Sequence, residues 1–158
     1  MGDCPVAVVS ISGPSRQGKS YTLNRLVSAA GGFPVSPGMK PCTHGIWMWP
    51  QALEVQGKPH KVLFLDSEGI ATKEQSSQAG STLVALAGVA SSLMIANQFN
   101  NLNEDSLGHL SVAAAVMRGL FRSTTGSVAA GCQPPCSPPE LLFLLRDFNL
   151  HSEKTASE

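Results

Sequence analysis

A stretch of eight residues near the N-terminus has the composition of a phosphate-binding loop. It reads Gly13-Pro14-Ser15-Arg16-Gln17-Gly18-Lys19-Ser20 and fits the pattern G-x-x-x-x-G-K-[ST] at every fixed position. Glycines let the backbone curl until its N–H groups point inward at phosphate oxygens. Lys19 would contact the β- and γ-phosphates of a nucleotide, and the Ser20 hydroxyl would ligate Mg²⁺. A glycine-rich turn without a ligand is the alternative, and chance matches to the whole pattern are rare.

Two further segments carry groups that suit the same chemistry. Asp66 follows an apolar run and begins Asp66-Ser67-Glu68-Gly69, so its carboxylate is expected at a strand end, where it can help to hold Mg²⁺. Gly69 offers a main-chain amide to the γ-phosphate. Thr43 lies in a Pro/Gly-rich loop, and its hydroxyl could reach Mg²⁺ when the γ-phosphate is present. For Thr43 the residues alone leave a plain turn threonine equally open.

Composition limits the classes of protein to which the chain can belong. It has 158 residues, 42% hydrophobic and 14% charged, which excludes disorder throughout. Eleven basic and eleven acidic side chains cancel, so no overall positive field exists to hold nucleic acid, and none is expected as a partner. Phosphate binding must therefore come from a local site.

Cysteine spacing and the apolar runs bear on the compartment. The four cysteines form no CxxC pair, and Cys132 and Cys136 are expected as reduced thiols of a loop. The most apolar stretch, Leu83 to Ala96, is shorter than the roughly 20 residues that a membrane helix needs. We expect a soluble, cytoplasmic protein with no membrane segment in this chain.

The elements that must position these residues alternate between strands and helices. Apolar runs predict strands at Val6–Ile11, Gly45–Trp49, Lys61–Leu65, Ser91–Ala96 and Leu141–Leu145, with Glu54–Gln56 as a hairpin partner of the second strand. Helical spacing is found from Lys19 up to a stop at Gly31-Gly32, at Ser81–Ala90, and at Asp105–Phe121, where Leu107, Leu110, Met117 and Leu120 form one stripe. This order predicts an α/β fold with a mostly parallel central sheet, and a ligand at the carboxyl ends of the strands.

Several motifs follow one another in a characteristic order. They are Arg16 in the loop, Ser20-Tyr21-Thr22-Leu23-Asn24, Thr43-His44-Gly45-Ile46-Trp47-Met48-Trp49, Leu65-Asp66-Ser67-Glu68-Gly69 and Leu144-Leu145-Arg146-Asp147-Phe148. With these motifs the chain resembles the GTPase domain of the guanylate-binding protein and atlastin group of dynamin-related GTPases, and is nearer the guanylate-binding branch. This resemblance implies a P-loop NTPase three-layer sandwich with the GTPase domain at residues 1–150, lacking its C-terminal part. Residues 123–139 are expected as a disordered insertion and 151–158 as a polar tail.

The resemblance also implies roles for individual residues. Binding of GTP or GDP is implied for Gly13, Pro14, Ser15, Arg16, Gln17, Gly18, Lys19, Ser20, Tyr21, Asp66, Gly69, Arg146 and Asp147. Mg²⁺ would be held by Ser20, Thr43 and Asp66. Catalysis would rest on Arg16, Lys19, Thr43 and Glu68. Asp147 would read guanine, because one carboxylate can accept from both N1–H and the 2-amino group.

Arg16 is the residue that the resemblance connects with mechanism. The resemblance implies that Arg16 is an internal arginine finger, which acts when two GTPase domains meet in a GTP-driven homodimer. An arginine finger raises the rate of hydrolysis by a factor of about 10³–10⁵. Pro41 stands where the guanylate-binding branch has a serine. A nucleotide-binding module without turnover therefore stays open as an alternative. A further alternative is an ATP-using P-loop protein in which Arg146 and Asp147 form only an ion pair.

Overall fold

The computed structural model describes residues 5–27, 32–35, 43–49, 52–54, 57, 61–69, 77–100, 104–125 and 138–147. The elements are β1 (Val6–Ser12), α1 (Lys19–Val27), β2 (Ile46–Met48), β3 (Leu53–Glu54), β4 (Lys61–Ser67), α2 (Ser77–Val89), β5 (Leu93–Phe99), α3 (Glu104–Thr125) and β6 (Glu140–Arg146). Each strand and helix that the apolar runs predicted is present with shifted ends. The predicted helix stop at Gly31-Gly32 lies partly outside the described residues.

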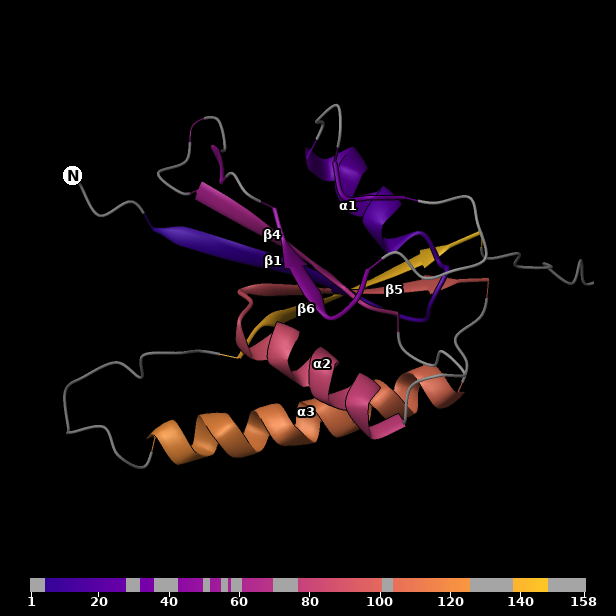
Figure 1. Ribbon diagram of the computed structural model, residues 1–158. Helices are drawn as coiled ribbons and strands as arrows, with labels where there is room; N and C mark the ends of the chain where they lie inside the picture. Colours follow the sequence, from indigo (N-terminus) through magenta and orange to yellow (C-terminus); the bar gives the residue numbers. More distant parts are fainter. Residues whose placement is uncertain are drawn as a thin grey trace, which may run out of the picture.

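The strands form one mixed sheet between two helical layers. Its order is β2-β4-β1-β5-β6, and β3 pairs with β4 off this path. β1 runs parallel to both β4 and β5, β5 runs parallel to β6, and only β2 and β3 are antiparallel to their neighbour. α1 covers one face, whereas α2 and α3 lie on the other (Figure 1). The predicted α/β class with a mostly parallel sheet and three layers is confirmed.

The apolar core divides into two clusters, one on each side of the sheet. The first joins α1 to β1, β4 and β5 through Ile11, Leu23, Val27, Phe33, Phe64 and Ile95. The second joins α2, α3 and β5 through Val84, Ala85, Met94 and Ala113. Helices on both faces explain why β1 reads as a continuous β-branched run and does not alternate. The carboxyl ends of β1, β4 and β5 are thereby fixed beside one another.

The pairing of β3 differs from the prediction. The sequence suggested that Glu54–Gln56 would pair with the second strand, but Leu53 and Glu54 pair with Val62 and Lys61 of β4. β2 lies along this same edge of β4, antiparallel to it. β3 therefore continues along an edge that β2 already occupies and does not fold back on β2. Gln56 lies outside the described residues.

α3 differs from its prediction in length and in the face it buries. It extends through Thr125, so the first residues of the insertion expected at 123–139 are helical, and 126–137 lie outside the described part. Leu110 and Met117 pack against the second cluster as expected. Leu107 and Leu120 are about half exposed. Ala113 is fully buried, because a small side chain lets α3 approach α2 closely.

No helix within the described ranges is long and apolar enough to cross a membrane.

Two leucines of α1 offer a matched test of the first cluster. Leu23 is 0% exposed and Leu26 is 51% exposed. Leu23→Ala should lower the free energy of unfolding by about 2–5 kcal/mol, because it leaves a cavity. Leu26→Ala should change it by less than about 1 kcal/mol. Urea denaturation of both variants checks this, and similar losses would contradict the assigned orientation of α1.

Candidate functional site

The loop between β1 and α1 lies directly on the end of a neighbouring strand. A Cβ atom at Gly13 would collide with the main-chain oxygen of Asn97 in β5, so only glycine allows this approach. Arg16 and Gly18 both have φ of 65° and lie in the left-handed region. These turns curl the chain before α1 begins at Lys19. The predicted phosphate-binding loop therefore has a curled backbone at the carboxyl edge of the sheet.

Lys19 lies inside this loop and not at its surface. The side chain is buried, and Nζ donates a hydrogen bond to the main-chain oxygen of Pro14 at 3.1 Å. Burial lowers the pKa of Lys19 from 10.5 to about 8, while the carboxylates of Asp66 and Glu68 oppose the shift. The protein compensates the charge of this buried ammonium group only in part, so the group is suited to an anionic ligand.

Three predicted metal ligands meet around one carboxylate. Ser20 Oγ donates to Asp66 Oδ2 at 2.6 Å, and Thr43 Oγ1 donates to the same oxygen at 2.9 Å. The two hydroxyl oxygens lie 3.5 Å apart. Burial raises the pKa of Asp66, and the hydrogen bonds from Ser20 and Thr43 oppose that shift. α1, the segment before β2, and β4 each contribute one of these groups.

The donor set around Asp66 fits a hard divalent cation. Asp66 Oδ1 is buried and has no hydrogen-bond partner within the described part of the chain. Carboxylate and hydroxyl oxygens are ligands that Mg²⁺ accepts, and it commonly takes one or two protein groups together with phosphates and water. Among the described residues no group of three or more His, Cys, Asp or Glu could hold a metal. The candidate is therefore this mixed set of one carboxylate and two hydroxyls.

Glu68 holds the Thr43 segment in place. Its Oε2 accepts a hydrogen bond from Gly45 N at 2.9 Å, and its own main-chain N donates to Gly45 O at 2.7 Å. His44 Nδ1 lies 3.7 Å from Glu68 Oε1. Gly69 is buried against the loop, since a Cβ there would collide with Ser15. Residues 66–69 thus touch both the phosphate loop and the Thr43 segment.

Sequence reasoning missed a polar network on the other side of the loop. Asn97, at the carboxyl end of β5, is fully buried. Its Nδ2 donates to the main-chain oxygen of Gln17 at 2.8 Å, and its Oδ1 accepts from Arg146 Nε at 3.1 Å. Arg146 Nη2 donates to the same Gln17 oxygen. The signal was available, because a polar residue follows the apolar run Ser91–Ala96 beside the loop-bearing strand.

Three other predicted site residues, Arg16, Tyr21 and Asp147, take no part in the hydrogen bonds described above. Arg16 is exposed at the tip of the loop, and Tyr21 is 53% exposed on α1. Asp147 follows Arg146 at the end of β6, is exposed, and has φ of 52°. Asp147 lies at the same sheet edge because its neighbour Arg146 is hydrogen-bonded to Asn97 and to the Gln17 carbonyl.

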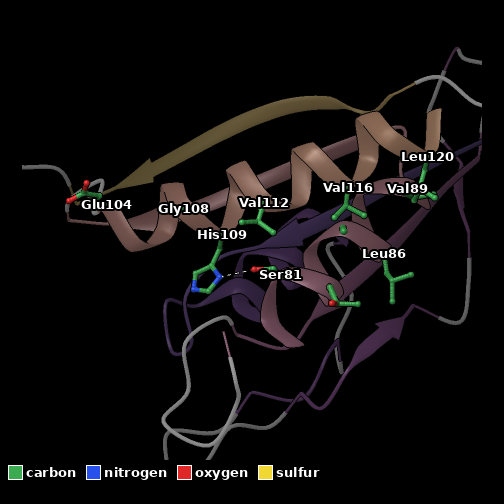
Figure 2. Close-up of a pocket in the computed structure, with 11 residues that line it drawn as sticks. Ser81, Leu86, Val89, Glu104, Gly108, His109, Val112, Val116 and Leu120 are labelled. Atoms are coloured by element: carbon green, nitrogen blue, oxygen red, sulfur yellow. Dashed lines mark hydrogen bonds between the residues drawn. The ribbon is translucent and has the colours of Figure 1, made fainter. Parts of the chain in front are cut away.

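A cavity of about 670 Å³ lies elsewhere, between α2 and α3 (Figure 2). None of the predicted site residues lines it.

The fold is an α/β sheet between helical layers, and the curled loop, the buried Lys19 and the cluster around Asp66 lie together at the carboxyl edge of its parallel strands. The chain belongs to the guanylate-binding protein family, because residues 1–157 match "Guanylate-binding protein, N-terminal domain". It is 36% identical over 154 residues to human guanylate-binding protein 3, which covers 94% of this chain and 26% of that protein. It is 33% identical over 152 residues to human guanylate-binding protein 7, with coverages of 92% and 23%. The mouse guanylate-binding protein 5 is 33% identical over 154 residues, with coverages of 92% and 25%. The chain thus spans about a quarter of the length of these relatives.

The burial of Lys19 predicts a gain in stability when its charge is removed. Below pH 8 both folded and unfolded states carry the charge, so its burial cost is fully present. Between about pH 8 and 10.5 the unfolded state binds more protons, and stability rises with pH. Without nucleotide, Lys19→Met should raise the free energy of unfolding at pH 7 by about 1–3 kcal/mol, and by less at pH 10.

Urea denaturation at the two pH values measures this effect. Lys61→Met is the matched control, because Lys61 is partly exposed and lies 3.4 Å from Glu54. It should give no comparable gain. A loss of stability in Lys19→Met at pH 7 would show that the buried ammonium is compensated within the protein.

Proposed function

We propose that this chain binds guanine nucleotides together with Mg²⁺ and hydrolyses the γ-phosphate of GTP. The observation that carries the proposal is the buried Lys19 inside the curled loop, beside the cluster of Ser20, Thr43 and Asp66. Membership of the guanylate-binding protein family supports the choice of GTP. Mg²⁺, when bound at that cluster, would neutralise charge on the β- and γ-phosphates.

Phosphate recognition is assigned to the loop and to Lys19. The main-chain N–H groups of residues 15–20 and the N-terminus of α1 would supply donors and a positive dipole end. A triphosphate beside Lys19 would favour its charged form and reverse the effect of burial on its pKa. Ligand binding would thus compensate the buried charge of Lys19.

Guanine recognition is assigned to Asp147. Its exposed carboxylate can accept hydrogen bonds from guanine N1–H and the 2-amino group, a donor pair that adenine lacks. Arg146 supports this position from inside, since its guanidinium is bound to Asn97 and to the Gln17 carbonyl. The residue next to Asp147 in the chain thus belongs to the polar network that contacts the phosphate loop.

Hydrolysis would proceed by in-line attack of water on the γ-phosphorus. The new P–O bond forms as the bond to the β–γ bridging oxygen breaks, and GDP leaves with the electron pair. Lys19 and the loop amides would stabilise the charge that develops on the phosphate oxygens. Glu68 positions Thr43 through its two hydrogen bonds with Gly45. Arg16, exposed at the loop tip, would act as an arginine finger when GTP drives two copies together.

A cytoplasmic location remains part of this proposal and rests on the cysteine spacing of the sequence. Activities and partners of the longer relatives are likewise proposals for this chain, which spans about a quarter of their length.

Nucleotide titrations test the guanine assignment. Fluorescent GTP should bind at least about tenfold more tightly than fluorescent ATP in the presence of Mg²⁺. Asp147→Asn should weaken GTP binding and favour xanthine nucleotides, because the amide presents a donor where the carboxylate accepts. Equal affinities for GTP and ATP would refute guanine reading, and the absence of any Mg²⁺-linked binding would refute the nucleotide site itself.

Turnover measurements test the role of Arg16. Arg16→Ala should lower kcat by a factor of about 10³ while changing GTP affinity little, since the finger acts in the transition state. Arg25→Ala is the matched control, because Arg25 is another exposed arginine, in the last turn of α1. Phosphate release per protein should rise with protein concentration. Zero release at all concentrations, with GTP still bound, would leave a binding module without turnover.

A further inference from the structure

The groove between α2 and α3 is lined by several exposed apolar side chains. Leu86 of α2 and Val112, Val116 and Leu120 of α3 are each 46–55% exposed, and all four line the groove. Figure 2 shows these side chains along the two facing helices. Single exposed apolar side chains are ordinary, but a contiguous set in a hollow marks an interaction surface.

The α3 side of the groove is a regular row. Gly108, Val112, Val116 and Leu120 follow one another at four-residue spacing, so they lie along one side of the helix. Leu86 and Val89 of α2 form the opposite wall. A trough with two helical walls is the shape that receives another helix.

The charges on α3 favour an antiparallel helix as the occupant. Glu104 lines the groove at the N-terminal end, whereas the exposed Arg118 and Arg122 stand near the C-terminal end. A second α3 laid antiparallel would bring acid near base at both ends, and the two helix dipoles would also be opposed. The chain has a formal net charge of zero, so two copies do not repel each other.

We propose that this groove binds a second copy of the chain, with the two α3 helices antiparallel across a two-fold axis. The row is complementary to itself, because a two-fold axis midway along it sets Val112 of one copy against Val116 of the other. Leu120 then faces Gly108 of the second copy. A Cβ at Gly108 would meet no atom within 4 Å, so a leucine has room there.

Two polar side chains of the groove are hydrogen-bonded to each other. Ser81 Oγ and His109 Nδ1 lie 3.0 Å apart in a hydrogen bond. Covering them with apolar side chains leaves neither of these atoms without a partner. The result is a bundle of α2 and α3 from each copy, which removes the exposed valines and leucines from water.

This contact does not require nucleotide. The groove lies in the α2–α3 layer, and none of the residues assigned to phosphate, Mg²⁺ or guanine lines it. It therefore differs from the GTP-driven contact in which Arg16 would act, and it should form without any nucleotide.

Sedimentation of the full chain without nucleotide tests the proposal. The protein should dimerise, and Leu120→Lys should weaken the dimer at least about tenfold, because it puts a charge into the interface. Leu26→Lys is the matched control, since Leu26 is 51% exposed near the end of α1 and Leu120 is 48% exposed. Circular dichroism confirms that both variants fold. A monomer at all concentrations, or equal weakening by both changes, would overturn the proposal.

Cross-linking tests the orientation separately. In a background with the four cysteines replaced by serine, Val112→Cys and Val116→Cys proteins are mixed and oxidised. The antiparallel arrangement predicts a disulfide mainly between the two different variants. Cross-linking of each variant mainly with itself would indicate parallel helices, and no cross-linking would indicate another occupant for the groove. Either result overturns the proposal, whatever the outcome of the GTP experiments.

Discussion

The structure depends on two buried charges of opposite sign at one edge of the sheet. Burial lowers the pKa of Lys19 and raises that of Asp66, so the charged form of each group is less stable in the fold than in water. Their mutual attraction offsets only part of this cost. A buried ion pair is commonly less stable than an apolar pair of similar size, so stability alone does not explain why both are present. Under the proposed function, a phosphate together with a cation would supply the missing compensation.

Hydrogen bonds to Asp66 also hold the surrounding segments in place. The hydroxyls of Ser20 and Thr43 both donate to Oδ2 of Asp66, so one of its two carboxylate oxygens is satisfied within the protein. A cation would exchange these hydrogen bonds for ligand bonds from the same oxygens. Glu68 also binds the main chain at Gly45. The Thr43 segment is thus fixed to the end of β4 at two points, through Asp66 and through Glu68.

The sequence was sufficient wherever the chemistry is local. The phosphate loop and the Asp66 segment are contiguous motifs, and the strands that carry them are apolar runs, so both could be placed at the carboxyl edge of a parallel sheet. The polar Asn97 after an apolar run was visible in the sequence, but its partners could not be named, because Gln17 and Arg146 lie far away in the chain. The same holds for β3, whose pairing depended on which strand already lay along β4. The buried face of α3 depended on its close contact with α2, which periodicity alone does not reveal.

The two proposed sites are connected through α2. The chain runs from Gly69, which lies against the phosphate loop, into α2, which forms one wall of the groove. If GTP favours one position of α2, the same free energy must appear in the dimer affinity, because coupling between two binding sites is reciprocal. If α2 keeps one position, the dissociation constant of the nucleotide-free dimer and that of the GTP-bound dimer are equal. Sedimentation with and without GTP therefore measures whether the groove is a fixed contact or one that responds to nucleotide.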